Sequence, residues 1–343
     1  MTGELVIDPE FSDASAFKNG LACVRVGDAY SGRYGFIDKQ GSFVIEPQFG
    51  WASDFSEGLA CVRLGTERTS KHGFVDLQGN VALDSSFDHA LDFSEDLASV
   101  CMGDAETGKW RHIDRQGNFV NQNQFDAASY FRENLAAVRV GNWMTGKWTF
   151  IDKQGRFITK PRFDAASDFS EGLAAVSIGT IKSSRFGFIN KQGRFAIPPS
   201  YTHALGFKEG LAAVLVGNWE SGKWGYIDGQ GQFVIEPQFD DASSFSEGLA
   251  SVRIGDAASS EEGYVDTHGQ VAIEARFSKA LAFKDGLAAV CVGEPASGKW
   301  GYIDREGEMV VAPQFDVAED FREGLARVRI GDEKTGKWGY ISR

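Results

Sequence analysis

One spacing constrains this chain more than any other feature: a short motif returns every 38 residues from end to end. The motif is Leu-Ala-x-Val, and its first residue falls at Leu21, Leu59, Leu97, Leu135, Leu173, Leu211, Leu249, Leu287 and Leu325. No insertion or deletion interrupts the spacing. A fixed period between about 20 and 50 residues indicates a repeat architecture. We therefore expect residues 1–343 to form a single repeat domain of nine units.

Each unit contains three segments that resemble β-strands. The first is the run that follows the marker Leu, where Ala22, Val24 and Val26 alternate with other residues. The second resembles KWGYID at 223–228, and the third resembles FVIEP at 233–237. Alternation with a period of two is typical of strands with one buried face. The expected fold is all-β, built from nine tandem three-stranded units.

Glycines and their replacements indicate the turns of the unit. The second and third strands are joined by D-x-x-G, in which Gly41 and its counterparts would supply the positive φ of a hairpin with a G1 bulge. The residue before the marker Leu is Gly in seven units and otherwise Asp96 or Asn134, which also tolerate a left-handed backbone. In contrast, the Gly of the Trp-Gly pair is replaced by Arg111 and Thr149, which predicts ordinary extended backbone there.

The order of strands at the two ends of the chain favours a closed ring. The first residues supply only a third strand, whereas the last residues supply a first and a second strand. The N-terminal third strand would therefore complete the C-terminal unit. The first strand carries small residues and the third runs into Pro, as expected for the inside and the outer edge of a propeller blade. We predict a propeller-like closed ring, with an open β-solenoid or superhelix as the alternative because three strands are few for a blade.

Composition excludes several classes of partner. The net charge is −13 and the pI is near 4.9. A nucleic-acid binder or a protein of anionic membrane surfaces needs a basic patch, and no Lys/Arg cluster occurs. No apolar run is long enough to span a bilayer, and the start MTGELVIDPEF does not resemble a signal peptide. We expect a cytoplasmic protein that binds neither nucleic acid nor membrane, with a removed leader as the alternative.

The sequence predicts no catalytic residue, no metal ligand and no cofactor. Histidine occurs five times and only His89 and His203 share a position in the repeat, so no triad or zinc site is indicated. Gly103, Gly108 and Lys109 match the opening of a phosphate-binding loop. Trp follows them where such a loop needs Ser or Thr, and the same pattern recurs in four other units. We interpret it as a turn, and we do not expect an enzyme.

Four aromatic residues outside the repeat consensus are the candidate interaction residues. Trp143 and Trp219 lie in loops between the first and second strands, with Tyr30 and Ile181 at nearby loop positions. Trp51 is a further aromatic residue that the repeat does not require. Large aromatic side chains at loop tips are typical anchors of protein interfaces and of sugar sites. The alternative is that these loops fold back onto neighbouring units.

Two segments carry a resemblance to a known family. GKWGYIDGQGQFVIEPQFDDASSFSEGLASVR (residues 222–253) and GKWGYIDREGEMVVAPQFDVAEDFREGLARVR (residues 298–329) resemble the bacterial WG-repeat family, and the likeness extends over the whole chain. The Trp-Gly pair itself departs from the pattern at His72, Arg111, Thr149, Phe186 and Glu262. The resemblance implies an all-β repeat module with interaction roles, and it brings no catalytic residues.

Three functions are compatible with these observations. The favoured one is a non-catalytic scaffold that binds a protein partner. The second is a lectin-like module in which Trp143 and Trp219 stack on sugar rings. The third, an enzyme with its site at the centre of a ring, is least supported because no cluster of His, Cys or Asp escapes the repeat.

Overall fold

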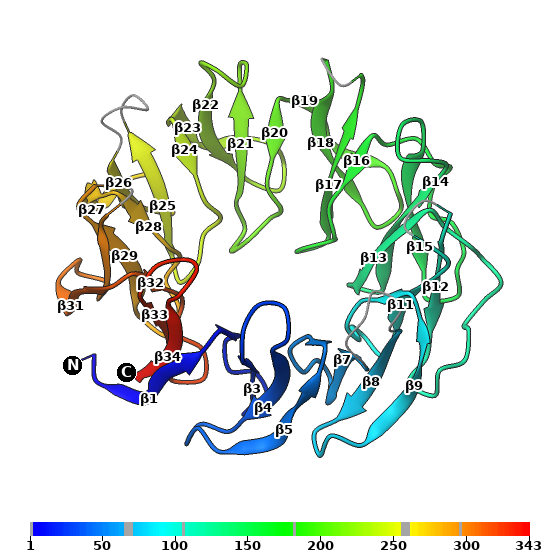
Figure 1. The fold of residues 1–343 in the computed structure, drawn as a ribbon. Coiled ribbons are helices and arrows are strands. Elements are labelled where there is room, and N and C mark those ends of the chain that lie inside the picture. The colour runs from blue at the N-terminus through cyan, green and yellow to red at the C-terminus, as the bar shows by residue number, and fades with distance from the viewer. Residues whose placement is uncertain (1–2, 65–70, 105–106, 181–182, 255–260, 295–296) are drawn as a thin grey trace.

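The protein folds into a closed ring of nine antiparallel sheets, the blades of a β-propeller (Figure 1). The computed structural model describes residues 3–343 apart from 65–70, 105–106, 181–182, 255–260 and 295–296. The described residues contain strands, turns and bends but no helix. The predictions of an all-β fold and of a propeller-like closed ring are therefore confirmed.

In eight blades the strands lie side by side in chain order, and in the ninth the N-terminal strand β1 is added outside the last three strands. The innermost strands are β2 (Asp13–Ala14), β6 (Trp51–Ala52), β10 (His89–Ala90), β13 (Ala127–Arg132), β16 (Ala165–Ala166), β20 (His203–Ala204), β24 (Asp241–Ala242), β28 (Lys279–Ala280) and β32 (Val317–Ala318). The second strands are β3 (Ala22–Val26), β7 (Leu59–Arg63), β11 (Ala98–Met102), β14 (Leu135–Val140), β17 (Leu173–Ile178), β21 (Ala212–Val216), β25 (Leu249–Ile254), β29 (Ala288–Val292) and β33 (Leu325–Ile330). We number the blades 1 to 9 in this order.

The third and outer strands complete the blades. The third strands are β4 (Arg33–Ile37), β8 (His72–Asp76), β12 (Lys109–Ile113), β15 (Lys147–Asp152), β18 (Arg185–Asn190), β22 (Lys223–Ile227), β26 (Glu261–Asp266), β30 (Lys299–Ile303) and β34 (Lys337–Ser342). The outer strands are β5 (Phe43–Phe49), β9 (Val81–Phe87), β19 (Phe195–Tyr201), β23 (Phe233–Phe239), β27 (Val271–Phe277), β31 (Met309–Phe315) and β1 (Leu5–Phe11).

Seven blades contain four strands, one more than the three that the sequence predicts. The additional strand lies in the linker before the marker Leu, for example β2, where Asp13 pairs with Arg25 and Ala14 with Val24. It has only two residues in eight of the nine blades, so no alternation of apolar and polar residues can reveal it. This short strand, rather than the Ala-rich one, is innermost in each blade.

The last blade joins the two ends of the chain. Strand β1 pairs with β34, with Leu5 opposite Ile341 and Phe11 opposite Trp338. It takes the place that the outer strand of the same unit holds in other blades, and both termini lie at this blade in Figure 1. The ring therefore closes through strand pairing. Closure leaves no open end of the ring at which another chain could add.

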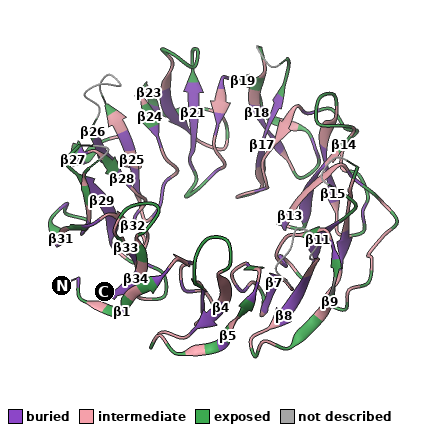
Figure 2. Cartoon of the chain, viewed as in Figure 1, coloured by how far each residue is buried: buried purple, intermediate pink, exposed green. Residues whose placement is uncertain are grey.

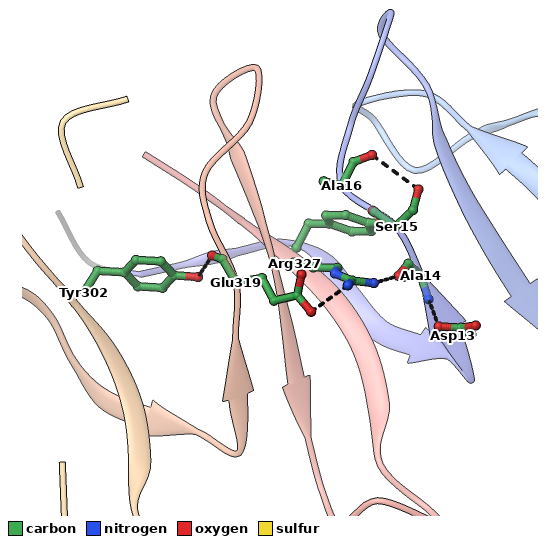
Figure 3. Close-up of polar contacts among 8 residues, drawn as sticks. Asp13, Ala14, Ser15, Ala16, Tyr302, Glu319 and Arg327 are labelled. Atoms are coloured by element: carbon green, nitrogen blue, oxygen red, sulfur yellow. Dashed lines mark hydrogen bonds and ion pairs between the residues drawn. The ribbon is translucent and has the colours of Figure 1, made fainter. Parts of the chain in front are cut away.

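Arg327 makes further contacts at this closing junction between blades 9 and 1. Its guanidinium donates to the carbonyl oxygen of Ala14 and, at 2.5 Å, to the carboxylate of Glu319 (Figure 3). Tyr302 donates to the backbone oxygen of Glu319 at 2.8 Å in the same view. All the other units carry Ala, Cys or Ser where the last one has Arg327. The unit that closes the ring thus has a cross-blade contact of its own.

The turn before the marker Leu is tighter than the sequence indicates. In blade 2, Ser56 and Leu59 exchange two backbone hydrogen bonds across Glu57 and Gly58, which have φ of 55° and 80°. Two successive residues with positive φ define a type I′ hairpin. The predicted positive φ before the marker Leu is confirmed, for example at Asp96 with 68°. The residue preceding it, Glu57 and its counterparts, also has positive φ, which was not predicted.

Meander topology gives the ring two different faces. Because consecutive strands are antiparallel, the turn before the marker Leu and the D-x-x-G turn lie at one end of each blade, which we call the hairpin face. The loops between the second and third strands, such as residues 141–146, lie at the opposite end, which we call the loop face. The three aromatic loop residues Tyr30, Trp143 and Trp219 are all on the loop face.

Buried aromatic rings fill the junctions between neighbouring blades, which we call seams. One residue of each third strand is fully buried and packs toward the next blade: Phe36, Phe74, His112, Phe150, Phe188, Tyr226, Tyr264, Tyr302 and Tyr340. Figure 2 shows the buried residues running along the second and third strands, with exposed residues on loops and outer strands. The four Tyr hydroxyls donate to backbone oxygens of the following blade, as Tyr226 does to Ser243 at 2.8 Å.

The Gly of the Trp-Gly pair lies against the outer strand and is replaced in the two blades whose described outer segments form no strand. A Cβ on Gly225 would lie 2.6 Å from the oxygen of Ile235 in β23, closer than real Cβ contacts allow. Blades 3 and 4, which carry Arg111 and Thr149 instead, are the two whose described outer segments form no strand. The backbone there is ordinary, as predicted, but the sequence did not reveal that Gly is needed for close approach.

Candidate functional site

A layer of side chains lies just below the loop face in every blade. The first residue of an inner strand, a residue of the second strand and one at the head of the third are paired across the sheet. In blade 2 these are Trp51, Arg63 and His72, and in blade 3 the corresponding layer pairs His89 with Cys101. Directly opposed residues point to the same face of a sheet. The layer therefore lines one side of a seam.

The seam between blades 2 and 3 opens into a cavity with aromatic walls. Its volume is about 520 Å³, and its walls include rings from three blades. The rings are Trp51, His72, His89, Trp110 and Tyr130. The Trp51 and His72 rings meet edge to face at 5.6 Å between centroids, and the His72 and His89 rings lie 5.7 Å apart. We call this cavity the 2/3 pocket.

Two charged groups also line the 2/3 pocket. Arg63 donates to the backbone oxygen of Gly50 at 3.2 Å. Asp92 accepts a hydrogen bond from the hydroxyl of Ser53. Burial raises the pKa of Asp92, an effect that the Ser53 hydrogen bond and the charge of Lys18 oppose. Burial also lowers the pKa of His72, which favours the neutral ring. The pocket thus presents aromatic walls with one acidic and one basic group.

The neighbouring 3/4 pocket, between blades 3 and 4, is larger and more polar. It encloses about 670 Å³ and shares His89 and Trp110 with the 2/3 pocket. Trp143 from the loop of blade 4 lines it together with Asn142 and Arg139. A flat ring beside amide and guanidinium groups can stack on an apolar face while the polar groups bind hydroxyls.

A third pocket continues this series to blade 5. The 4/5 pocket has a volume of about 500 Å³ and is lined by Trp143, Met144 and Phe186 among others. Because Trp143 lines both the 3/4 and the 4/5 pockets, its side chain separates them. Beyond it, the ring of Phe186 lies 4.9 Å from that of His203, which lies 5.3 Å from Trp219. We call the loop-face surface from Trp51 to Trp219 the aromatic sector.

Ion pairs across the seams hold this layer in place. The Lys at the start of a third strand contacts the Asp that enters the next blade: Lys71–Asp88, Lys109–Asp126, Lys147–Asp164, Lys223–Asp240 and Lys299–Asp316. In three described cases within the sector or beside it, the other oxygen of the Asp accepts a backbone N–H, as Asp126 does from Gly141 at 2.7 Å. These carboxylates are therefore structural.

The four predicted interaction residues have different surroundings. The exposed fraction is 99% for Tyr30, 79% for Trp143, 68% for Trp219 and 36% for Trp51. Trp143 and Trp51 both line pockets. Trp143 lies in a loop, and Trp51 lies in the inner strand β6. Trp219 contacts His203, and Tyr30 lines none of the described pockets. Ile181 lies outside the described residues.

Sequence reasoning missed the rings that complete the sector. Trp110 follows the repeat and His72 departs from its Trp-Gly pair, so neither stands out in the sequence as an interaction residue. Tyr130 lies in inner strand β13, in a segment that the sequence analysis does not predict to be a strand. The only signal in the sequence was that His72 and Tyr130 differ from their counterparts in other units. Residues that break a repeat pattern at the same seam are candidates for one site, but the seams themselves are visible only in the ring.

The described residues offer no arrangement for a metal ion. No group of three or more His, Cys, Asp and Glu side chains in this part of the chain is placed to hold one. The stretch from Gly103 to Lys109 connects two antiparallel strands, β11 and β12, so it is not followed by the helix that a phosphate-binding loop requires. Nor does the described chain contain a helix that could cross a membrane.

Comparison with known proteins identifies the family. The WG containing repeat matches nine times, at residues 1–30, 34–65, 73–110, 110–142, 148–179, 186–218, 224–256, 263–294 and 300–338. The chain belongs to the WG-repeat family. The predicted resemblance is thereby confirmed. A comparison with curated protein sequences finds no match.

Solved structures with a similar fold are distant in sequence. A eukaryotic initiation factor is 12% identical with a TM-score of 0.62, over 87% of this chain and 86% of that one. The acylaminoacyl peptidase of Pyrococcus horikoshii is 12% identical with a TM-score of 0.46, over 97% of this chain and 57% of the peptidase. A prolyl endopeptidase is 11% identical with a TM-score of 0.46, over 88% and 55%. These likenesses concern the fold alone.

Proposed function

We propose that this WG-repeat protein is a non-catalytic scaffold that binds a protein partner through its aromatic sector. The observation that carries the proposal is the run of three adjoining pockets on one face, with Trp143 as a highly exposed side chain between two of them. Exposed Trp side chains next to pockets are typical centres of protein interfaces. A rigid ring presents them at little cost in conformational entropy.

Binding rather than catalysis is supported by how the polar groups of the sector are used. Asp126 and Asp164 are each held by a Lys and by a backbone N–H. His72 and His203 pack against aromatic rings, and burial lowers the pKa of both. A general base needs a proton to abstract and a partner that orients it, and these side chains are committed to packing instead.

Photo-crosslinking in cells tests the scaffold. A photoreactive amino acid at Met144, which is 73% exposed beside Trp143, should trap one protein partner at high yield. Trp143→Ala should abolish that crosslink because it removes the central ring of the sector. Tyr30→Ala is the matched control, since Tyr30 is an exposed aromatic residue on the equivalent loop of blade 1. Loss of the crosslink in both variants, or in neither, contradicts the proposal.

A lectin-like function is the second candidate, and the 3/4 pocket favours it. Trp143 lies there beside Asn142 and Arg139, a combination that suits a sugar ring. A glycan array compares wild type with Trp143→Ala and Trp219→Ala. A sugar signal that depends on Trp143 supports the lectin function, whereas an empty array with a retained protein crosslink leaves only the scaffold.

We further propose a cytoplasmic location. The four cysteines, Cys23, Cys61, Cys101 and Cys291, are buried and unpaired. Burial raises the pKa of Cys23 and Cys61, so both are inert thiols rather than redox centres. Free structural thiols are typical of a reducing compartment. Cell fractionation with an immunoblot checks this, and recovery of the protein outside the cytoplasm would contradict it.

A further inference from the structure

The 2/3 pocket differs from its neighbours in the number of aromatic rings around it. Five of its ten lining residues carry an aromatic ring, and they come from blades 2, 3 and 4. The faces of Trp and Tyr rings are electron-rich and attract cations, most strongly when water is excluded. Surrounding a cation with such rings is a general way to bind alkylammonium groups. The walls of this pocket therefore suit a cationic side chain with an apolar stem.

Carboxylates lie where the 2/3 pocket adjoins a second hollow. Asp92 lines both the 2/3 pocket and an adjoining hollow of about 360 Å³, which Asp13 and Asp54 also line. Tyr34 donates to Asp13, and Ser53 donates to Asp92. The charge of Asp54 contributes to the raised pKa of Asp92. A bound cation would relieve this repulsion between like charges.

Basic side chains beside these carboxylates make the sign of the ligand's charge testable. Arg63 lines the 2/3 pocket, while Lys18 and Arg327 line the adjoining hollow. Arg327 is already bound to Glu319, and Arg63 to the backbone of Gly50. The protein as a whole carries a net charge of −13, which attracts basic partners over a distance. Asp92 and Arg63 should therefore affect the binding of a cation in opposite directions.

We propose that the 2/3 pocket binds the cationic side chain of a lysine, free or N-methylated, in a basic segment of the protein partner. The inference rests on the proposed scaffold function and names the chemistry of the partner. The apolar stem of the lysine packs between Trp51 and Trp110, and its ammonium group faces Asp92. The neutral carbon isostere of the same side chain gains the apolar contact but neither of the charge interactions.

Calorimetry and ligand-observed NMR on the full-length protein test the proposal. The probes are N-acetyl-lysine methylamide, its Nε-trimethyl form, and the neutral analogue in which a tert-butyl group replaces trimethylammonium. The trimethylated probe should bind at least about fivefold more tightly than the neutral analogue. Its methyl protons should shift upfield because the aromatic rings surround them. Equal binding of the two, or no binding of either cation, overturns the proposal.

Two variants that each remove one charge should change the affinity in opposite directions. Asp92→Asn should weaken binding of the trimethylated probe about three- to tenfold, and Arg63→Gln should strengthen it. A neutral ligand would respond to neither, and an anionic one would respond in the opposite sense; either result contradicts the proposal. Trp219→Ala is the matched control, since it removes a ring of the aromatic sector that does not line this pocket. Thermal unfolding of each variant verifies that the ring is intact.

Failure here is distinguishable from failure of the scaffold. If the crosslink from Met144 depends on Trp143 while lysine analogues do not bind, the scaffold stands and the cationic ligand is wrong. If lysine analogues bind and Asp92→Asn and Arg63→Gln change their affinity as expected, but no crosslink depends on Trp143, the 2/3 pocket binds a cation and the proposed scaffold function of the aromatic sector is wrong.

Discussion

Single residues set the chemistry of each seam because each unit places a different side chain in the same buried position. Four third strands carry Phe there and four carry Tyr, whose hydroxyl reaches a backbone oxygen of the next blade. His112 is the exception, with an exposed fraction of 1% and no hydrogen-bond partner for either ring nitrogen among the described residues. Burial lowers the pKa of His112 to about 4.

Acid should therefore destabilise the protein through His112. Its pKa is 6.5 in the unfolded chain and about 4 in the folded one, so the unfolded state binds an additional proton between these values. Stability is unaffected above pH 6.5, falls by about 1.4 kcal/mol per pH unit below it, and levels off near pH 4. The total loss is about 3 kcal/mol from this residue.

Replacing His112 with the Phe of other blades should remove this slope. His112→Phe should also raise the free energy of unfolding at pH 7 by about 1 kcal/mol, because no buried polar group is left unpaired. Urea unfolding at pH 7 and pH 4.5 measures both effects. His268→Gln, at a side chain that is 78% exposed, is the control. An unchanged slope in His112→Phe would contradict the assignment.

Among the elements, the outer strand is the one whose presence correlates with a single residue of the third strand. The Trp-Gly glycine lets the outer strand cross the third strand at close range, and Thr149 shows what replaces that contact. The hydroxyl of Thr149 binds the backbone oxygen of Thr159 in the outer segment of blade 4, and Arg111 binds that of Asn121 in blade 3. Asn121 and Thr159 also stand where every other blade has Ile, Leu or Val. In blades 3 and 4 the outer segment and the third-strand residue packed against it therefore both differ from those of the other blades.

Gly225→Ala should loosen β23. The added Cβ would collide with the backbone of Ile235 and Pro237, and overpacking of this kind costs about 1–3 kcal/mol. Hydrogen exchange should show lost protection at 233–239 while the other blades are unaffected. Gly229→Ala, in the same blade where nothing lies within 4 Å, is the control. Equal effects of the two substitutions would contradict a steric role.

At the scale of the whole molecule, a chain of carboxylates joins the blades on the hairpin face. In seven units the Glu of the type I′ turn accepts backbone N–H groups from the next blade: Glu57, Glu95, Glu133, Glu171, Glu209, Glu247 and Glu323. Glu323 makes this contact across the closing seam, to Asn19 at 2.8 Å. Blade 8 carries Asp285 instead, one methylene shorter, and no such bond from it occurs among the described residues.

Asp285→Glu should supply the link that blade 8 lacks; blade 1, with Asn19 at this position, also has no carboxylate there. The longer side chain can reach the N–H groups of Glu323 and Gly324 as its counterparts do, and the gain should be about 1 kcal/mol. Calorimetry measures it. We propose that the nine units form one domain, so a single unfolding transition should shift upward. Asp285→Asn, which keeps the short side chain, is the control. Several separate transitions would contradict the single domain.

The sequence by itself determined the repeat and three strands of its unit, and it favoured closure of the ring over an open solenoid or superhelix. These follow from local patterns: alternation indicates strands, recurring glycines indicate turns, and the N-terminal residues supply a third strand that can complete the last unit. The two-residue inner strands and the positive φ of Glu57 were not predictable, because both depend on contacts with neighbouring strands and blades. The same holds for the Trp-Gly glycine, whose ordinary backbone gives no local sign of the strand packed against it.

Only the tertiary structure decided where a site could form. Trp51, His89 and Tyr130 stand about one repeat apart in the sequence, and nothing local relates them. They line one pocket because ring packing brings neighbouring blades face to face. Residues that the repeat places identically thus become neighbours across a seam, and a ligand meets several units at once. The physical reason is that the repeat specifies each blade, whereas a binding site between blades is specified by the differences among them.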